Sequence, residues 1–137
     1  MKNSISVRAV TENLKRVIDF IGQNECLADD PKALSRIEIA AEEIFVNIAH
    51  YAYPDSEGDA VIETEVTTDP PAIAITFRDS GEPYDPLAKE DPDITLSAEK
   101  RRIGGLGIFL VKKLMDEVAY KYEDGQNLLT IIKLLDK

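Results

Sequence analysis

One stretch of the chain, residues 31–51, has the periodicity of a long amphipathic α-helix and limits the folds that the chain can adopt. Its large apolar residues recur at steps of three and four and therefore share one stripe: Leu34, Ile37, Ala41, Ile44, Ile48 and Tyr51. Asp30 and Pro31 fit an N-cap and a first helical residue, and the helix should stop before Pro54. A helix with one apolar stripe must bury it against a second layer.

The segments around this helix supply that layer. The expected strands are, in chain order, 4–9, 60–67, 72–79, 117–123 and 127–135. A first helix is expected from Thr11, as a plausible N-cap, and a third after Gly107. Turns are expected from Thr67 to Pro71, where the two prolines cannot sit in a central strand, and at Asp124-Gly125. Because helices and strands do not alternate strictly, the order predicts a two-layer α/β sandwich: a mixed, mostly antiparallel sheet covered on one face by three helices.

The bulk properties indicate one acidic domain, 1–137. With 26 acidic and 16 basic side chains the formal charge is −10, which argues against binding to nucleic acid or to an anionic membrane surface. A single cysteine, Cys26, cannot form an internal disulfide, and no apolar run of signal-peptide or membrane-spanning type is present. These features predict a cytoplasmic location.

Two polar residues on the long helix are candidates for chemistry. Glu43 and Asn47 are four residues apart, lie on one face and border the apolar stripe. Both are hard oxygen ligands of the kind that Mg²⁺ takes beside phosphate oxygens and water. Glu42 points about 100° away and is the weaker candidate. The alternative is an ordinary solvated helix face.

A second candidate element is Asp79-Ser80-Gly81, which directly follows a predicted strand. A carboxylate at a strand end can point into a cleft and accept a hydrogen bond from an exocyclic amine such as that of adenine. The alternative is a simple turn, because these three residue types are common in turns.

A third candidate element closes the long segment 80–103, which is rich in proline. Gly104-Gly105-Leu106-Gly107 opens a helix, and such a start can bring backbone N–H groups close to phosphate. The alternative is a flexible hinge. The preceding run, Lys100-Arg101-Arg102, either neutralises a γ-phosphate or forms a solvated loop.

The three elements in this order resemble the Bergerat ATP-binding fold of gyrase and histidine kinases, over nearly the whole chain. Within that superfamily the chain looks most like the anti-sigma-factor serine/threonine kinases. The stretches that carry this likeness are Glu42-Glu43-Ile44-Phe45-Val46-Asn47-Ile48-Ala49-His50-Tyr51-Ala52-Tyr53, Glu82-Pro83-Tyr84-Asp85-Pro86, Gly107-Ile108-Phe109-Leu110-Val111-Lys112-Lys113-Leu114-Met115-Asp116, Tyr122 and Gly125-Gln126-Asn127.

The resemblance implies a role for each candidate residue. Glu43 would be the general base, Asn47 the magnesium ligand, and Asp79 and Gly81 the readers of adenine. The phosphates would lie beneath an 82–103 lid, and the nucleotide-binding set includes Arg102, Gly104, Gly105, Leu106 and Gly107. The family often has a glycine where this chain has Ile103, which puts lid movement in question more than nucleotide binding.

The expected function is therefore an ATP- and Mg²⁺-dependent kinase that phosphorylates a small antagonist protein and sequesters a sigma factor, in a family that often forms homodimers. An alternative is a non-catalytic module that grips its partners when ATP is bound. A third reading, a detached histidine-kinase domain, lacks the upstream helix that carries the histidine. His50, the only histidine, is expected to pack or to cap its helix.

Overall fold

A computed structural model describes residues 2–54, 56–83, 85–88 and 105–135 of the chain. Its strands are β1 (Lys2–Arg8), β2 (Asp59–Thr68), β3 (Pro71–Asp79), β4 (Glu117–Glu123) and β5 (Gln126–Leu134). Its helices are α1 (Leu14–Gly22), α2 (Pro31–Tyr51) and α3 (Gly105–Leu114). Short 3₁₀ turns cover Thr11–Asn13, Glu25–Leu27 and Pro86–Ala88.

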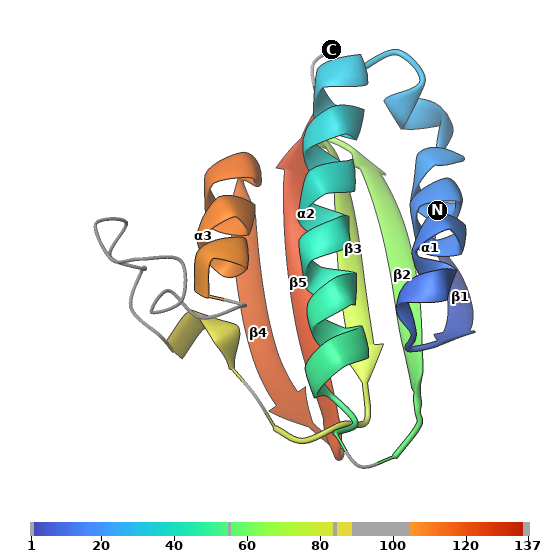
Figure 1. Cartoon of the computed structure of the whole chain (residues 1–137). Helices are drawn as coiled ribbons and strands as arrows, with labels where there is room; N and C mark the ends of the chain where they lie inside the picture. Colours follow the sequence, from blue (N-terminus) through green and yellow to red (C-terminus); the bar gives the residue numbers. More distant parts are fainter. Residues whose placement is uncertain (1, 55, 84, 89–104, 136–137) are drawn as a thin grey trace.

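The five described strands form one sheet in the order β1-β2-β3-β5-β4, and each of the four described pairings is antiparallel. Figure 1 shows the three helices lying together on one face of this sheet. The expected two-layer α/β sandwich is confirmed. The expectation of a mixed sheet is wrong for the described residues, because every pairing, including that of the neighbours β3 and β5, is antiparallel.

The core lies between the helix layer and one face of the sheet. Phe77 pairs with Ile62 on one side and Leu129 on the other, and all three side chains are buried. Ile73 and Ile75, predicted to share a face with Phe77, are fully buried as well. Alternate residues of each strand therefore face the helices, as an antiparallel sheet covered on one side requires.

Helix α2 crosses the middle of the sheet. The Asp30 carboxylate accepts a hydrogen bond of 3.2 Å from the Ala33 N–H, so the predicted N-cap is confirmed. Four residues of the predicted stripe are buried, namely Ile37, Ala41, Ile44 and Ile48. Tyr51, placed on the same stripe by the sequence, is 47% exposed because the helix ends there.

One local expectation is wrong and another is confirmed. Thr11 is not an N-cap: Val10 precedes a 3₁₀ turn and α1 starts only at Leu14, with no side-chain cap at either start. The expected turn at Asp124-Gly125 is confirmed, with φ of 54° and 78° at these two residues. Two successive positive φ values match the twist of the strands that the turn joins.

The expected 82–103 lid lies mostly outside the described residues, since 84 and 89–104 are not among them. Its described beginning holds the short turn Pro86–Ala88. None of the described helices combines the length and the apolar character that crossing a bilayer requires.

Candidate functional site

Glu43 and Asn47 lie on one flank of α2, and both side chains are partly buried, whereas Glu42 is exposed. At 100° per residue, Leu34 falls about 180° from Glu43 and about 140° from Asn47 around the helix. Leu34 Cδ1 lies 3.9 Å from the position that a Cβ on Gly22, the last residue of α1, would take. The flank that carries Glu43 and Asn47 therefore points away from α1, toward the side where α3 lies beside α2 in Figure 1.

The chemistry of this flank suits a ligand that brings its own charge. Within the described part of the chain, no hydrogen bond or ion pair occupies the Glu43 carboxylate or the Asn47 amide. The described residues contain no group of three or more His, Cys, Asp or Glu side chains that could hold a metal ion. Mg²⁺ bound at Asn47 would therefore take its other ligands from phosphate and water, the usual arrangement for this ion.

Asp79 ends β3 and is 6% exposed. Its Oδ1 accepts two hydrogen bonds, from the Gly81 N–H at 2.9 Å and from Asn127 Nδ2 at 3.0 Å. The carboxylate is held at the point where β3 ends, close to the C-terminal end of α2. A buried carboxylate fixed by two donors is suited to recognition of a hydrogen-bond donor on a ligand.

Gly81 lies directly against the end of α2. A Cβ on this residue would come within 2.2 Å of the Ala52 carbonyl oxygen, and the next N–H, that of Glu82, donates to the same oxygen at 3.1 Å. Only glycine permits this approach of two backbones. The approach fastens the Asp-x-Gly element to the end of the helix that carries Glu43 and Asn47.

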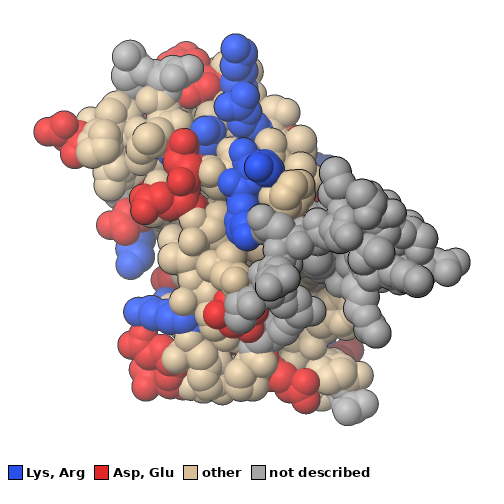
Figure 2. All heavy atoms as spheres, turned by 90° about the vertical axis from the view of Figure 1, so that its left-hand side faces the viewer, with Lys and Arg blue, Asp and Glu red and all other residues tan. Residues whose placement is uncertain are grey.

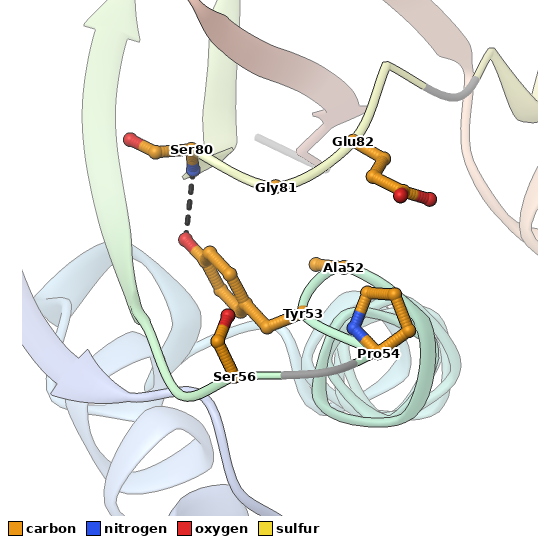
Figure 3. A pocket seen from close by; sticks show the side chains of 7 residues that line it. All are labelled: Ala52, Tyr53, Pro54, Ser56, Ser80, Gly81 and Glu82. Carbon is orange, nitrogen blue, oxygen red and sulfur yellow. Dashed lines mark hydrogen bonds between the residues drawn. The ribbon is translucent and has the colours of Figure 1, made fainter.

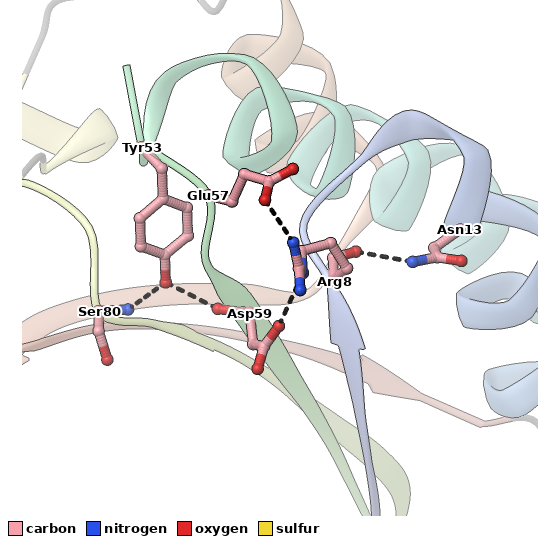
Figure 4. Close-up of polar contacts among 6 residues, drawn as sticks. All are labelled: Arg8, Asn13, Tyr53, Glu57, Asp59 and Ser80. Carbon is pink, nitrogen blue, oxygen red and sulfur yellow. Dashed lines mark hydrogen bonds and ion pairs between the residues drawn. The ribbon is translucent and has the colours of Figure 1, made fainter. Parts of the chain in front are cut away.

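Tyr53 makes a second link at the same place. Its hydroxyl accepts from the Ser80 N–H at 2.8 Å and donates to the Asp59 carbonyl oxygen at 2.7 Å, as Figure 4 shows. Burial, and then the nearby Asp79 and Asp59 charges, raise the pKa of this hydroxyl. Tyr53 therefore remains protonated at neutral pH and can make both bonds. Nearby, the Arg8 guanidinium forms an ion pair with the Glu57 carboxylate, with a nitrogen–oxygen distance of 2.8 Å.

An open pocket of about 320 Å³ lies beside this link and is shown in Figure 3. Its lining residues are Ala52, Tyr53, Pro54, Ser56, Ser80, Gly81 and Glu82. It includes Gly81 but not Glu43, Asn47 or Asp79. The pocket borders the predicted adenine-reading element and does not coincide with the flank of α2 that carries Glu43 and Asn47.

The glycine motif opens α3, as expected: Gly105, Leu106 and Gly107 form its first turn. The N-terminus of such a helix favours anions. Gly104, and the basic run with Arg102, lie outside the described residues.

His50 is exposed in the last turn of α2, with its ring edge-on to that of Tyr51 at 5.9 Å. Of the two expected roles, packing or capping, this position fits the one at the end of the helix. A histidine in the last turn is well placed to interact with the C-terminal end of the helix dipole.

Positive charge gathers on the side of the molecule where α3 lies, despite the net charge of −10. Figure 2, which views this side, shows a run of Lys and Arg side chains over its upper half. Lys112 and Lys113 are exposed in the last turn of α3, and Lys113 Nζ lies 5.3 Å from the centre of the Phe109 ring. These cations lower the repulsion that an anionic group approaching them would meet.

Three residues around Asp79 were not singled out for a role by the sequence: Asn127, Tyr120 and Tyr53. Asn127 had been noted only as part of a turn. Its contact with Asp79 depends on the pairing of β3 with β5, where the two residues are direct partners. A single sequence contains no signal for that register.

Comparisons with known proteins show to which family the chain belongs. A family model described as "Histidine kinase-like ATPase domain" matches residues 7–133. The chain is 30% identical over 99 residues to the serine-protein kinase RsbW of Listeria monocytogenes, covering 69% of this chain and 62% of that protein. It is 31% identical over 104 residues to the RsbW of Oceanobacillus iheyensis, covering 69% and 61%. The expected resemblance to serine kinases is thereby confirmed.

Two further likenesses extend this result. The serine/threonine-protein kinase BtrW of Bordetella bronchiseptica is 26% identical over 95 residues, covering 69% of this chain and 66% of that protein. The crystal structure of the RsbU and RsbW domains of Rv1364c from Mycobacterium tuberculosis superposes with a TM-score of 0.68 at 17% identity, covering all of this chain and 33% of the other. At that identity the second likeness concerns the fold alone. The chain spans just over three fifths of the length of the RsbW relatives named above.

Proposed function

Since this chain belongs to the histidine kinase-like ATPase domain family, we propose that it is an ATP-dependent serine/threonine protein kinase of the anti-sigma-factor type. Its acceptor is a small antagonist protein, its other partner is a sigma factor, and it acts in the cytoplasm. The observation that carries the proposal is that Glu43 and Asn47 lie on the flank of α2 that points away from α1 and toward α3. A carboxylate and an amide are thus on the side where the glycine-rich N-terminus of α3 begins.

Different residues of the site bind different parts of the nucleotide. Asp79, held by Gly81 N–H and Asn127, accepts a hydrogen bond from the exocyclic amine of adenine. The first turn of α3, Gly105 to Gly107, offers backbone N–H groups and the positive end of a helix dipole to the phosphates. Arg102 and Gly104 complete the phosphate-binding set in this proposal. Mg²⁺ at Asn47 would supply charge neutralisation between the phosphates.

Glu43 acts on the acceptor. The serine or threonine oxygen forms a bond to the γ-phosphorus, the bond from that phosphorus to the β,γ-bridging oxygen breaks, and ADP leaves. The hydroxyl proton passes to the Glu43 carboxylate. A hydroxyl group is a weak nucleophile at neutral pH, and a positioned carboxylate is suited to accept its proton. A histidine acceptor would not require such a base, so Glu43 favours a hydroxyl acceptor.

Two variants of adjacent residues test this role. Glu43→Gln keeps the shape of the side chain but cannot take up a proton, so ATP affinity should remain while transfer to the acceptor falls by about 100-fold or more. Glu42→Gln is the matched control, because Glu42 is the neighbouring residue and is exposed. Transfer is measured with labelled ATP and small proteins encoded beside this gene. Normal transfer by Glu43→Gln would exclude Glu43 as the base, and His50 would be tested next.

The competing function is a module that binds partners when ATP is bound, without phosphoryl transfer. It predicts ATP-dependent capture of a partner by the wild-type protein and no labelled product with any acceptor. The same assay, run beside a binding measurement, separates the two functions.

A further inference from the structure

Asn127 is a buried polar residue that contacts Asp79, and its further hydrogen bonds distinguish it from the other neighbours of that carboxylate. It is 7% exposed and lies directly opposite Asp79 in the register of β5 against β3. Its Nδ2 donates to Asp79 Oδ1 at 3.0 Å and to the Glu82 carbonyl oxygen at 2.9 Å. Its Oδ1 accepts a hydrogen bond from the Tyr120 hydroxyl.

These contacts fix the orientation of the Asn127 amide. An ionised carboxylate and a carbonyl oxygen only accept hydrogen bonds, so the NH₂ group must face Asp79 and Glu82. The oxygen then faces Tyr120, whose hydroxyl is the donor. The amide cannot turn over without losing its bonds to Asp79 and to the Glu82 carbonyl oxygen. Asn127 therefore presents a hydrogen-bond donor to Asp79 in one defined position.

The consequence for Asp79 is an asymmetric carboxylate. Both described donors, Gly81 N–H and Asn127 Nδ2, bind Oδ1, and Oδ2 has no hydrogen-bond partner among the described residues. In that part of the chain, Thr64 Oγ1 is the one fully buried side-chain polar atom without a partner, so Asp79 Oδ2 is not sealed from solvent. One oxygen is held by the protein and the other remains available to a ligand.

We propose that Asn127, supported by Tyr120, is a positioning residue that sets the Asp79 carboxylate for recognition of the 6-amino group of a purine nucleotide. The inference rests on the proposed binding of ATP, and it adds a residue that determines specificity. Asn127 also donates to the Glu82 carbonyl oxygen, so the residue that positions Asp79 contacts the start of the segment between β3 and α3 as well.

The specificity follows from the direction of hydrogen bonds. A 6-amino group donates to Asp79 Oδ2, whereas the 6-oxo group of inosine or guanosine presents an acceptor and meets a negatively charged oxygen without a proton between them. This discrimination requires that the Asp79 carboxylate cannot turn away from the base. If it could turn, Oδ2 would avoid the 6-oxo group, and the unfavourable contact between two acceptors would cost little binding energy. Loss of the Asn127 donor leaves only the Gly81 N–H on Oδ1, so the carboxylate is held less firmly and the discrimination should weaken.

The test uses ATP and ITP as probes, each with Mg²⁺, and measures both dissociation constants by calorimetry. Asn127→Leu removes the donor at similar volume, and Tyr120→Phe removes only the supporting hydroxyl. Thr130→Val is the matched control: Thr130 lies on the same strand, its Oγ1 pairs with Thr76 Oγ1 at 3.0 Å on the opposite face of the sheet, and it does not touch Asp79.

We expect Asn127→Leu to weaken ATP binding about tenfold, to leave ITP binding nearly unchanged, and so to reduce the ratio of the two constants. Tyr120→Phe should act in the same direction by about threefold, and Thr130→Val should change neither constant. If Asn127→Leu fails to fold, Tyr120→Phe decides the outcome alone.

Unchanged discrimination in Tyr120→Phe and Asn127→Leu, with ATP bound by the wild-type protein, would overturn this inference and leave the proposed function intact. An equal loss of ATP and ITP binding would also overturn it, because that result indicates a structural role. Absence of ATP binding by the wild-type protein would overturn the proposed function and this inference with it.

Discussion

The Cα of Gly81 lies so close to the Ala52 carbonyl oxygen that a Cβ would come within 2.2 Å of it. Two segments of the proposed site, the end of β3 and the end of α2, therefore meet through backbone atoms. Gly81 is needed here for space, and the contact holds the adenine-reading element at a fixed distance from the helix that carries Asn47.

We predict that Gly81→Ala lowers stability by about 2–3 kcal/mol, because the neighbouring atom is backbone and cannot move aside cheaply. The midpoint of thermal unfolding should fall by about 5 °C or more. Gly22→Ala is the control, since its added Cβ meets nothing closer than Leu34 Cδ1 at 3.9 Å. That control should be neutral or slightly stabilising, and equal losses in both variants would contradict the prediction.

Nucleotide preference gives a second prediction. Titration with ATP should raise the melting temperature of the protein, because a ligand that binds only the native state stabilises it. GTP should raise it much less, since Asp79 would read the adenine amine and guanine has a carbonyl at that position. Asp79→Asn should weaken the effect of ATP specifically. Equal stabilisation by GTP, or none by either nucleotide, would count against the assignment.

Metal dependence gives a third prediction. Asn47→Ala removes the proposed ligand, so the gain in ATP affinity that Mg²⁺ produces in the wild-type protein should be lost, while affinity without Mg²⁺ should change little. The dissociation constants are measured by calorimetry with Mg²⁺ and with EDTA. A variant that keeps the full magnesium effect would show that another group holds the ion.

Asp116 gives a prediction about pH. The Leu134 N–H at 2.7 Å and Lys133 at 3.0 Å lower the pKa of its carboxyl group below the ordinary value of 3.8. A lowered folded-state pKa contributes stability that is present above the unfolded value and is lost as the pH falls through the folded one. Asp116→Asn should therefore be less stable than wild type near neutrality, and the difference should shrink as the pH falls below about 4.

Thermal unfolding of both proteins between neutral and acidic pH measures this difference. Asp19→Asn is a useful control, because Asp19 forms an exposed ion pair with Lys15 on α1 and such pairs contribute little. A constant difference between Asp116→Asn and wild type over the whole range would contradict the assigned cause.

The sequence predicted the features that depend on neighbouring residues. The Asp30 cap and the Asp124-Gly125 turn follow from local chemistry, and the shared flank of Glu43 and Asn47 follows from helical geometry. The start of α3 at Gly105 agrees with the glycine motif. These predictions required only spacings of a few residues.

The remaining features depend on contacts between distant residues. Asn127 and Asp79 are 48 residues apart, and Tyr53 reaches Ser80 across 27. Such contacts are set by strand register and by where a helix ends, and neither is encoded in local periodicity. Thr11 failed as an N-cap for a related reason, since a 3₁₀ turn intervenes before α1 begins at Leu14.

The chemical stability of the phosphorylated product distinguishes a serine/threonine kinase from a histidine kinase most directly. The protein is incubated with Mg²⁺, ATP labelled at the γ-phosphate and small candidate proteins encoded beside its gene, and the labelled product is then treated with acid. The account predicts that label is transferred to a separate protein, that it survives acid as phosphoserine or phosphothreonine does, and that Glu43→Gln abolishes it while Glu42→Gln does not. An acid-labile phosphohistidine product would contradict the account and return the chain to the histidine-kinase class.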